Sequence, residues 1–219
     1  LTFAALMMAV RLVDRFGKAR VVSALFGVVA VIFILGVAMI RSDPRWQKLE
    51  ETIPIALDTQ TNRSWLVREN YPMTVNGQIV DISAYERLAW AKEGLGLILD
   101  SPWGTGYNRL AFGAGIDRKY QMNGTYRAHA HSGIIDFAIA NGVVGLVLWF
   151  GFLGSLFYVG WQAYRGEQVG LGLGLMFLIS GFMGRSIVDS NIRDHILQQF
   201  FFLAMLFYGL TVPARSRKL

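Results

Sequence analysis

Long apolar stretches without a charged residue alternate with polar segments along the chain. A helix needs about 20 apolar residues to cross a bilayer, where its backbone polar groups must be paired internally. The pattern therefore predicts four transmembrane helices and half of a fifth, Leu1–Val10, which resembles the second half of a helix and carries no signal-peptide features. We expect about five transmembrane segments and a protein that extends further upstream. The four charge-free stretches are Val21–Ile40, Gly142–Gln162, Val169–Gly184 and Ile196–Pro213.

Most of the polar residues lie in one long segment, Arg41–Ala130, between the second and third predicted membrane helices. Ser83 with Glu86 three residues later forms a capping box, which predicts a helix over about residues 83–99. The predicted fold is an all-α, polytopic membrane protein with one large, partly helical loop. Its three parts are two membrane helices with a basic turn (1–40), the loop (41–130), and three membrane helices with a basic tail (131–219).

The net charge of +6 follows the predicted topology, since basic residues gather in three short segments: residues 11–20, the connection around Arg165, and the C-terminal tail. Short loops rich in Lys and Arg stay cytoplasmic, and one topology places all three clusters on that side. This distribution explains the charge better than nucleic-acid binding does. It also predicts that the Arg41–Ala130 loop and the Arg185–His195 turn share the opposite, external face of the membrane. The chain has no cysteine, which excludes disulfides and thiolate chemistry.

The candidate chemistry lies on that external face, where His129 and His131 precede a membrane helix. A neutral histidine is suited to act as a general base near neutral pH. Arginine binds phosphate oxygens through a bidentate fork, which makes Arg87 on the predicted 83–99 helix a candidate for a diphosphate. We expect no metal site, because no third ligand accompanies the two histidines at a suitable spacing, and no cofactor. No Gly-x-Ser-x-Gly nucleophile motif occurs.

Other polar side chains on this face have two interpretations. Arg45, in an aromatic collar with Trp46, either anchors the chain at the interface or binds substrate. Arg185, Asp189 and Arg193 crowd the last external turn, where they either contact substrate or pair with one another. The segment Ser101–Gly115 is rich in glycine, so its exposed backbone N–H groups are candidates for binding an anion, although a lone glycine-rich loop is a weak signal.

These elements together resemble the O-antigen ligase and polymerase superfamily. The resemblance rests on Arg87-x-x-Trp90, on the turn Asp100–Gly106, and on His131 eleven residues before the first glycine of Asn141–Gly145. Two departures are a serine, Ser132, in place of the common asparagine after the histidine, and a spacing of three rather than four residues between Arg87 and Trp90. The resemblance covers the chain from Leu1 to about Leu210.

The resemblance implies a polytopic helical enzyme that moves a glycan from undecaprenyl diphosphate, without a metal or ATP. It implies that His131 acts as the base and that Arg87 contacts the diphosphate. The ligases use lipid A-core as acceptor, and the polymerases use a second lipid-linked glycan. A further functional arginine of the family falls just upstream of Leu1 by spacing. Asp189 is the nearest match to an acidic residue that matters in some members.

Three hypotheses remain at this point. The first is a membrane glycosyltransferase, ligase or polymerase, and the second is a polysaccharide transporter subunit. Transporters place ionisable residues near the bilayer midplane, whereas the central parts of these spans carry no charge, which favours an interfacial enzyme. The third, a purely structural membrane component, leaves the histidine pair without a role. The expected partners are the lipid-linked donor, the acceptor and the bilayer, with His129, Arg45, Arg185, Asp189 and Arg193 as substrate-binding candidates beside the catalytic His131 and Arg87.

Overall fold

The structure is a computed structural model that describes residues 18–106, 108–122 and 129–211. Within these ranges the chain is all-helical and contains no strand, which confirms the predicted fold class. The helices are α2 (Lys18–Ser42), α3 (Pro44–Leu57), α4 (Ser64–Val67), α5 (Ile82–Asp100), α6 (Ala111–Lys119), α7 (Gly133–Arg165), α8 (Val169–Val188) and α9 (Asp194–Thr211).

Two helices of the described residues are long and apolar enough to cross a membrane, namely α7 and α8. A third span is possible if α2 and α3 count together, although Phe26–Met39 and Pro44–Leu57 are bent by 85° relative to each other. The apolar part of α9, His195–Thr211, is shorter than these spans. Two or three candidate spans are thus found where four were predicted in this part of the chain, and Leu1–Val10 lies outside the described residues.

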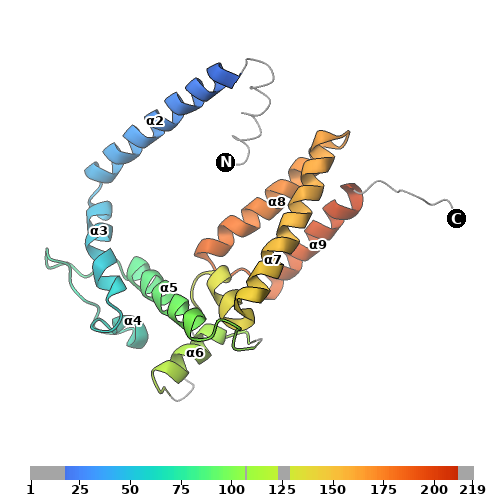
Figure 1. Cartoon of the computed structure of the whole chain (residues 1–219). Helices are drawn as coiled ribbons and strands as arrows, with labels where there is room; N and C mark the ends of the chain where they lie inside the picture. Colours follow the sequence, from blue (N-terminus) through green and yellow to red (C-terminus); the bar gives the residue numbers. More distant parts are fainter. Residues whose placement is uncertain (1–17, 107, 123–128, 212–219) are drawn as a thin grey trace.

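The membrane-sized helices and the helices of the long loop occupy opposite ends of the molecule (Figure 1). Helices α7, α8 and α9 pack together as a bundle, while α2 stands apart from it and contacts α3. The start of α2, the end of α7 and the end of α9 lie at one end, and α3 to α6 lie at the other (Figure 1). This arrangement places the loop helices α5 and α6 beside the start of α7.

Two separate apolar cores hold these parts together. The first joins α3, α4, α5, α6 and the start of α7 around Trp65, Tyr85, Trp90, Phe112 and Ile139. The second lies inside the bundle, where Trp149 of α7 packs against Phe182 of α8 and Phe200 of α9. The start of α7 contributes to both cores, through Ile139 and Phe137. It is therefore the segment that connects the loop helices to the bundle.

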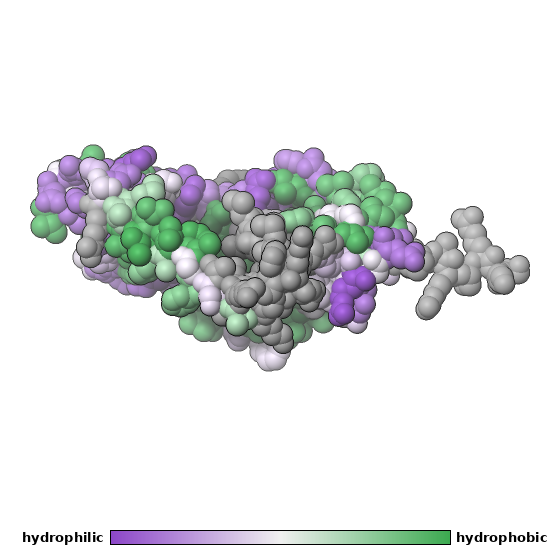
Figure 2. Space-filling view, turned by 90° about the horizontal axis from the view of Figure 1, so that it is seen from above, coloured by the Kyte–Doolittle hydropathy of each residue, from purple (hydrophilic) through white to green (hydrophobic). Residues whose placement is uncertain are grey.

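The surface of α2 is largely apolar and bare. Phe26 and Phe33 are 76% and 70% exposed, respectively. In the space-filling view from above, apolar surface covers much of the visible face, and polar residues gather at the left, where Figure 1 places α3 and the chain that follows it (Figure 2). An apolar helix surface of this kind is suited to lipid or to another membrane helix.

Helix α5 begins one residue earlier than predicted and with a different cap. Its N-cap is Asp81, whose side chain accepts a hydrogen bond from the backbone N–H of Ala84 at 3.0 Å. The predicted capping box of Ser83 and Glu86 is wrong: Ser83 lies inside the first turn, and Glu86 accepts from the hydroxyl of Tyr71 instead. Both an aspartate and a serine cap a helix well, so the local sequence offered two possible starts.

Helix α7 is interrupted at Gly142, which has φ 70° and ψ −177°. The turn Pro102–Gly106 docks into this break. The N–H groups of Thr105 and Gly106 donate to the carbonyls of Ile139 and Ala140 at 2.9 and 3.0 Å, and the N–H of Val143 donates to the carbonyl of Pro102 at 2.8 Å. The turn therefore satisfies backbone groups that the interruption leaves without helical partners. The part of α7 after the break corresponds to the predicted span Gly142–Gln162.

Candidate active site

The centre of the site is a stacked pair, His131 and Trp90. Their ring centroids lie 4.9 Å apart with an angle of 8° between the planes. Trp90 is 2% exposed on α5, and His131 lies two residues before α7, so the stack joins the loop helices to the membrane bundle. Gly94, one turn further along α5, allows this close approach, because a Cβ there would lie 2.4 Å from Cγ2 of Ile135. The missing side chain of Gly94 therefore makes room for Ile135 of α7. This room is filled, so it is not free space beside Arg87.

The histidine has an unusual backbone conformation, with φ 50°. This left-handed region is unfavourable for residues with a side chain unless neighbouring contacts hold it. Such contacts surround the segment: the N–H of Ala130 donates to Asp136 at 2.9 Å, the hydroxyl of Ser132 donates to the carbonyl of Ser186 at 3.2 Å, and the N–H of Gly133 donates to the carbonyl of Asp189 at 2.9 Å. The segment is therefore held in place by α7 and by the end of α8.

Both histidines are kept neutral by their surroundings. Burial lowers the pKa of His131 below its ordinary value, and the neighbouring charges of His129 and Arg87 lower it further, against the opposing effect of Asp189 and Asp136. Burial also lowers the pKa of His129, with a further contribution from Arg193. The two rings lie 4.2 Å apart, and Nδ1 of His129 accepts from the N–H of His131 at 3.3 Å. A neutral imidazole with a lowered pKa is in the protonation state that a general base requires.

Arg87 lines a groove of about 550 Å³, and its charge also acts on His131. Its side chain is exposed, and within the described part of the chain it makes no ion pair. The groove lies between α5 and the bend that joins α2 to α3, which we call the elbow. Apolar, cationic and acidic side chains line it together: Met39, Asp43, Arg45, Trp46, Leu49, Asp81, Ser83, Ala84 and Arg87.

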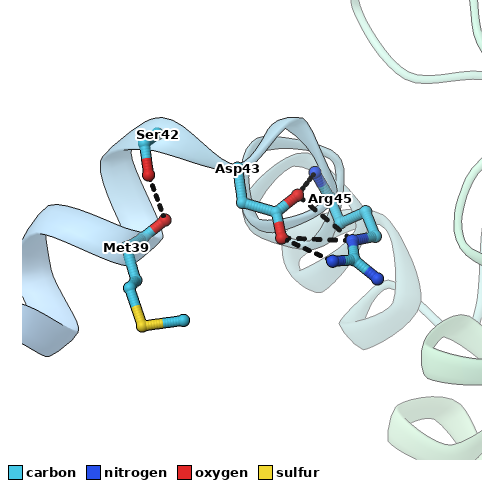
Figure 3. Close-up of polar contacts among 4 residues, drawn as sticks. All are labelled: Met39, Ser42, Asp43 and Arg45. Carbon is cyan, nitrogen blue, oxygen red and sulfur yellow. Dashed lines mark hydrogen bonds and ion pairs between the residues drawn. The ribbon is translucent and has the colours of Figure 1, made fainter.

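Arg45 lies on the elbow side of the same groove but already has a partner. Its Nε and Nη2 donate to the carboxylate of Asp43 at 3.1 and 2.9 Å, as Figure 3 shows. This hydrogen bonding lowers the pKa of Asp43. Asp43 also caps α3 by accepting from the backbone N–H of Arg45. The structure thus places Arg45 at the groove and gives it a local structural role as well.

The residues around the turn between α8 and α9 lie beside the histidines. Arg185 and Asp189 form an ion pair at 2.8 Å, and the hydrogen bond from Arg185 lowers the pKa of Asp189. The backbone carbonyl of Asp189 accepts from Gly133, which brings this turn against the histidine segment. Arg193 donates to the carbonyl of Arg109 at 3.5 Å, a long contact. Asp189 therefore reaches the site through its backbone, while its carboxylate is paired within α8.

Arg68 is a further site residue that the sequence did not single out. Its guanidinium carbon lies 5.1 Å from the centre of the Trp90 ring, the same ring that stacks on His131. Arg68 ends α4 with φ 61° and also approaches Glu86, with 3.8 Å between Nε and Oε1. Only its place in the fold brings it here, since it lies 22 positions before Trp90 in a segment without helical periodicity.

The glycine-rich turn has a different role from the one considered above. The N–H groups of Thr105 and Gly106 are used on the carbonyls of the α7 break, so these two are not free to bind an anion. Gly104 lies directly on that break, because a Cβ there would be 2.5 Å from the backbone nitrogen of Gly142. Among the residues that the structure describes, no group of three or more His, Cys, Asp or Glu side chains is placed to hold a metal ion.

Comparisons with known proteins identify the family. No curated protein and no solved structure matches the chain. The family model described as O-antigen ligase matches residues 1–150, which include Arg87, Trp90, the docked turn and His131. This match covers more than half of the sequence and agrees with the resemblance noted from the motifs. The chain belongs to the O-antigen ligase family, and it is thereby a membrane glycosyltransferase of the ligase and polymerase type.

Proposed function

We propose that this protein transfers a glycan from undecaprenyl diphosphate to a hydroxyl group of lipid A-core, on the periplasmic face of the bacterial inner membrane. The observation that carries the proposal is the stack of His131 on Trp90, next to an exposed Arg87 at the end of the membrane bundle. A base and a phosphate-binding group thus lie together where a lipid-linked substrate leaves the bilayer. Membership of the family supports the same reaction type.

In the proposed reaction, the acceptor hydroxyl oxygen attacks the anomeric carbon of the donor glycan. The bond between that carbon and the diphosphate oxygen breaks, and undecaprenyl diphosphate leaves with the bonding electron pair. His131 takes the hydroxyl proton, which its lowered pKa permits near neutral pH. Arg87 stabilises the negative charge that develops on the leaving diphosphate. The reaction needs no metal ion or ATP in this proposal, because the diphosphate is already an activated leaving group.

The groove between α5 and the elbow is the proposed place for the donor. Arg87 on one wall would hold the diphosphate, while Met39, Trp46 and Leu49 offer apolar contacts for the first part of the lipid chain. We propose Arg45, Arg185, Arg193, His129 and Asp189 as secondary substrate contacts. Two of the arginines in this set are already paired with a carboxylate, which makes their contribution smaller than that of Arg87.

The alternative function is a polymerase that uses a second lipid-linked glycan as acceptor. Both reactions use the same base and the same leaving group, so the described site is compatible with either. A transporter subunit is the less favoured alternative, because the candidate residues gather at one end of the bundle.

The experiment is transfer in vitro from an undecaprenyl-diphosphate glycan by the full-length protein, with lipid A-core and with a second lipid-linked glycan as separate acceptors. Transfer to lipid A-core that requires His131 would support the ligase, and transfer to the lipid-linked glycan would replace it with the polymerase. A chelator should leave the rate unchanged. Failure with both acceptors, from a folded sample, would refute the enzyme proposal.

A further inference from the structure

A buried carboxylate outside the proposed chemistry connects three parts of the site. Asp136 lies in the first turn of α7. One of its oxygens accepts from the backbone N–H of Ala130 at 2.9 Å, and the other accepts from the hydroxyl of Ser190. Ser190 is 8% exposed and belongs to the turn between α8 and α9. The side chain therefore links the histidine segment to a turn 54 residues away in sequence.

The position of the first hydrogen bond determines what this link does. Ala130 lies between His129 and His131, so the carboxylate fixes the peptide that carries both imidazole rings. His131 has the left-handed backbone that residues other than glycine rarely adopt, and such a conformation persists only where the surroundings hold it. Asp136 holds Ala130, the residue directly before His131, in addition to the contact that Nδ1 of His129 makes with the N–H of His131. Without Asp136, the N–H of Ala130 loses its partner and the segment gains freedom to relax.

The second hydrogen bond extends the link to the turn between α8 and α9. Gly133 donates to the carbonyl of Asp189, and Ser190 follows directly in the chain. The turn that carries Asp189 is thus attached to the start of α7 twice, once through backbone and once through Asp136. The charged groups nearest to Asp136 that act on it are Arg193 and His131. The carboxylate is placed to keep the histidine and the Arg193 turn in a fixed relation.

We propose that Asp136 is the positioning residue for His131, and that it acts by holding the backbone of the histidine segment against the α8–α9 turn. This inference rests on the proposed function, in which His131 is the base. A base displaced by about 1 Å from its working position loses about 100-fold in rate. Asp136 itself contacts neither substrate nor the reacting atoms.

Two substitutions of Asp136 separate its effect on the position of His131 from the effect of its negative charge. Asp136→Asn keeps an acceptor for Ala130 and presents an amide N–H₂ to Ser190, whose hydroxyl is also able to accept. Asp136→Ala removes both contacts. If position is what matters, Asp136→Asn retains transfer within about threefold, while Asp136→Ala lowers kcat by about 10- to 100-fold and leaves the KM for the donor nearly unchanged.

The experiment uses full-length protein and adds a readout that does not depend on activity. Hydrogen exchange at residues 129–133 should be faster in Asp136→Ala than in wild type, and close to wild type in Asp136→Asn. Ser190→Ala, which breaks only the second contact, should show a smaller increase in exchange and a few-fold loss of kcat. Ser155→Ala, which removes an exposed hydroxyl on α7, and Asp100→Asn, at the exposed end of α5, are the matched controls.

Several results would overturn the proposal. Wild-type kcat and wild-type exchange in Asp136→Ala would show that the carboxylate holds nothing. Equal loss in Asp136→Asn and Asp136→Ala, with normal exchange in both, would mean that the charge and not the position is required. If Asp136→Ala does not fold, the Asn and Ser190 variants still decide. If the wild type itself transfers no glycan, the proposed function fails, while the exchange measurement still tests the role of Asp136.

Discussion

Each wall of the groove has an arginine and, on the same helix, a tryptophan, but the surroundings of these side chains differ. On the α5 side, Arg87 is exposed, and one turn away Trp90 is buried and stacked on His131. On the elbow side, Arg45 is held in a bidentate contact with Asp43, and Trp46 is 44% exposed. An arginine that already has a carboxylate partner has fewer free N–H donors and less net positive charge to offer a phosphate. The comparison teaches that the partner of a basic side chain, and not its presence alone, distinguishes a candidate ligand-binding group from a local support.

The most direct test of this comparison removes the proposed base, His131, on the α5 side. His131→Ala should lower glycan transfer by about 100- to 10,000-fold, the range expected for general-base catalysis. The measurement is the transfer rate in vitro, with insertion into the membrane checked by melting temperature. On the elbow side, Trp46→Ala should retain most of the activity. His195→Ala, an exposed histidine at the start of α9, is the matched control. Near-normal transfer by His131→Ala would end the general-base hypothesis.

The second test concerns the rigidity of the α5 side. Gly104→Ala should lower the free energy of unfolding by more than about 2 kcal/mol, because Gly104 has φ 87° and a Cβ there would overlap the backbone of Gly142. Gly106→Ala has a similar φ of 91° but open space around it, so only the backbone strain of about 1–2 kcal/mol is expected. Gly36 of α2 leads to the elbow, and nothing lies within 4 Å of a Cβ there, so Gly36→Ala should be nearly neutral. Equal melting temperatures for the Gly104 and Gly106 variants would show that the docked turn is dispensable.

The third test replaces each of the two groove arginines, Arg87 and Arg45, with lysine. Arg87→Lys should lower kcat/KM by about tenfold, which corresponds to ~1.4 kcal/mol, because an ammonium group does not reproduce the bidentate fork. Arg45→Lys should change kcat/KM by less than about twofold, since its exposed pair with Asp43 contributes little at a surface. If the Arg45 variant lost more activity than the Arg87 variant, the assignment of the two walls would be reversed.

The smallest expected effect is on the pH profile. In the proposed reaction the neutral form of His131 is the active one, and its lowered pKa should keep activity constant until the pH falls below the ordinary histidine value of about 6.5. Arg87→Gln removes a positive charge that opposes protonation of His131, so the acid limb of kcat/KM should move to higher pH by less than about one unit. The Arg45→Gln variant should show no such movement. An acid limb that is unchanged in Arg87→Gln would mean that Arg87 and His131 do not interact.

The predictions that succeeded concern properties of a single segment. Hydropathy and charge placed the helices that became α2, α7, α8 and α9. The roles assigned to Arg87 and His131 stay predictions. The predicted N-cap of α5, Ser83, and the observed one, Asp81, differ by two residues, and both residue types favour an N-cap. Hydropathy predicted four spans in this part of the chain, and two or three candidates are found in the described residues, because α2 and α3 are bent by 85° at the elbow and the apolar part of α9 is shorter than a span.

The features that the sequence did not reveal depend on contacts between distant segments. The turn Pro102–Gly106 carried a weak signal for anion binding, whereas its N–H groups complete the backbone of α7. Arg68 reaches Trp90 only because α4 folds back toward α5. The left-handed backbone of His131 likewise lies between hydrogen bonds to Asp136 and to the carbonyl of Asp189, contacts that lie outside any local pattern. A spacing of residues predicts which side chains share a helix face, but not which other segment will meet that face.

The interruption at Gly142 also sets the height of the site above the lipid. After the break, Val143–Arg165 is long enough at 1.5 Å per residue to cross a hydrocarbon layer of about 30 Å without the residues before it. The short helical piece Gly133–Asn141 is then not needed to cross that layer, and at the same rise it extends about 14 Å from the break, with His131 two residues further on. A diphosphate attached to a membrane lipid lies within this narrow zone of headgroups. A variant that restored a straight, continuous α7 would therefore move the base away from the depth at which its lipid-linked donor resides.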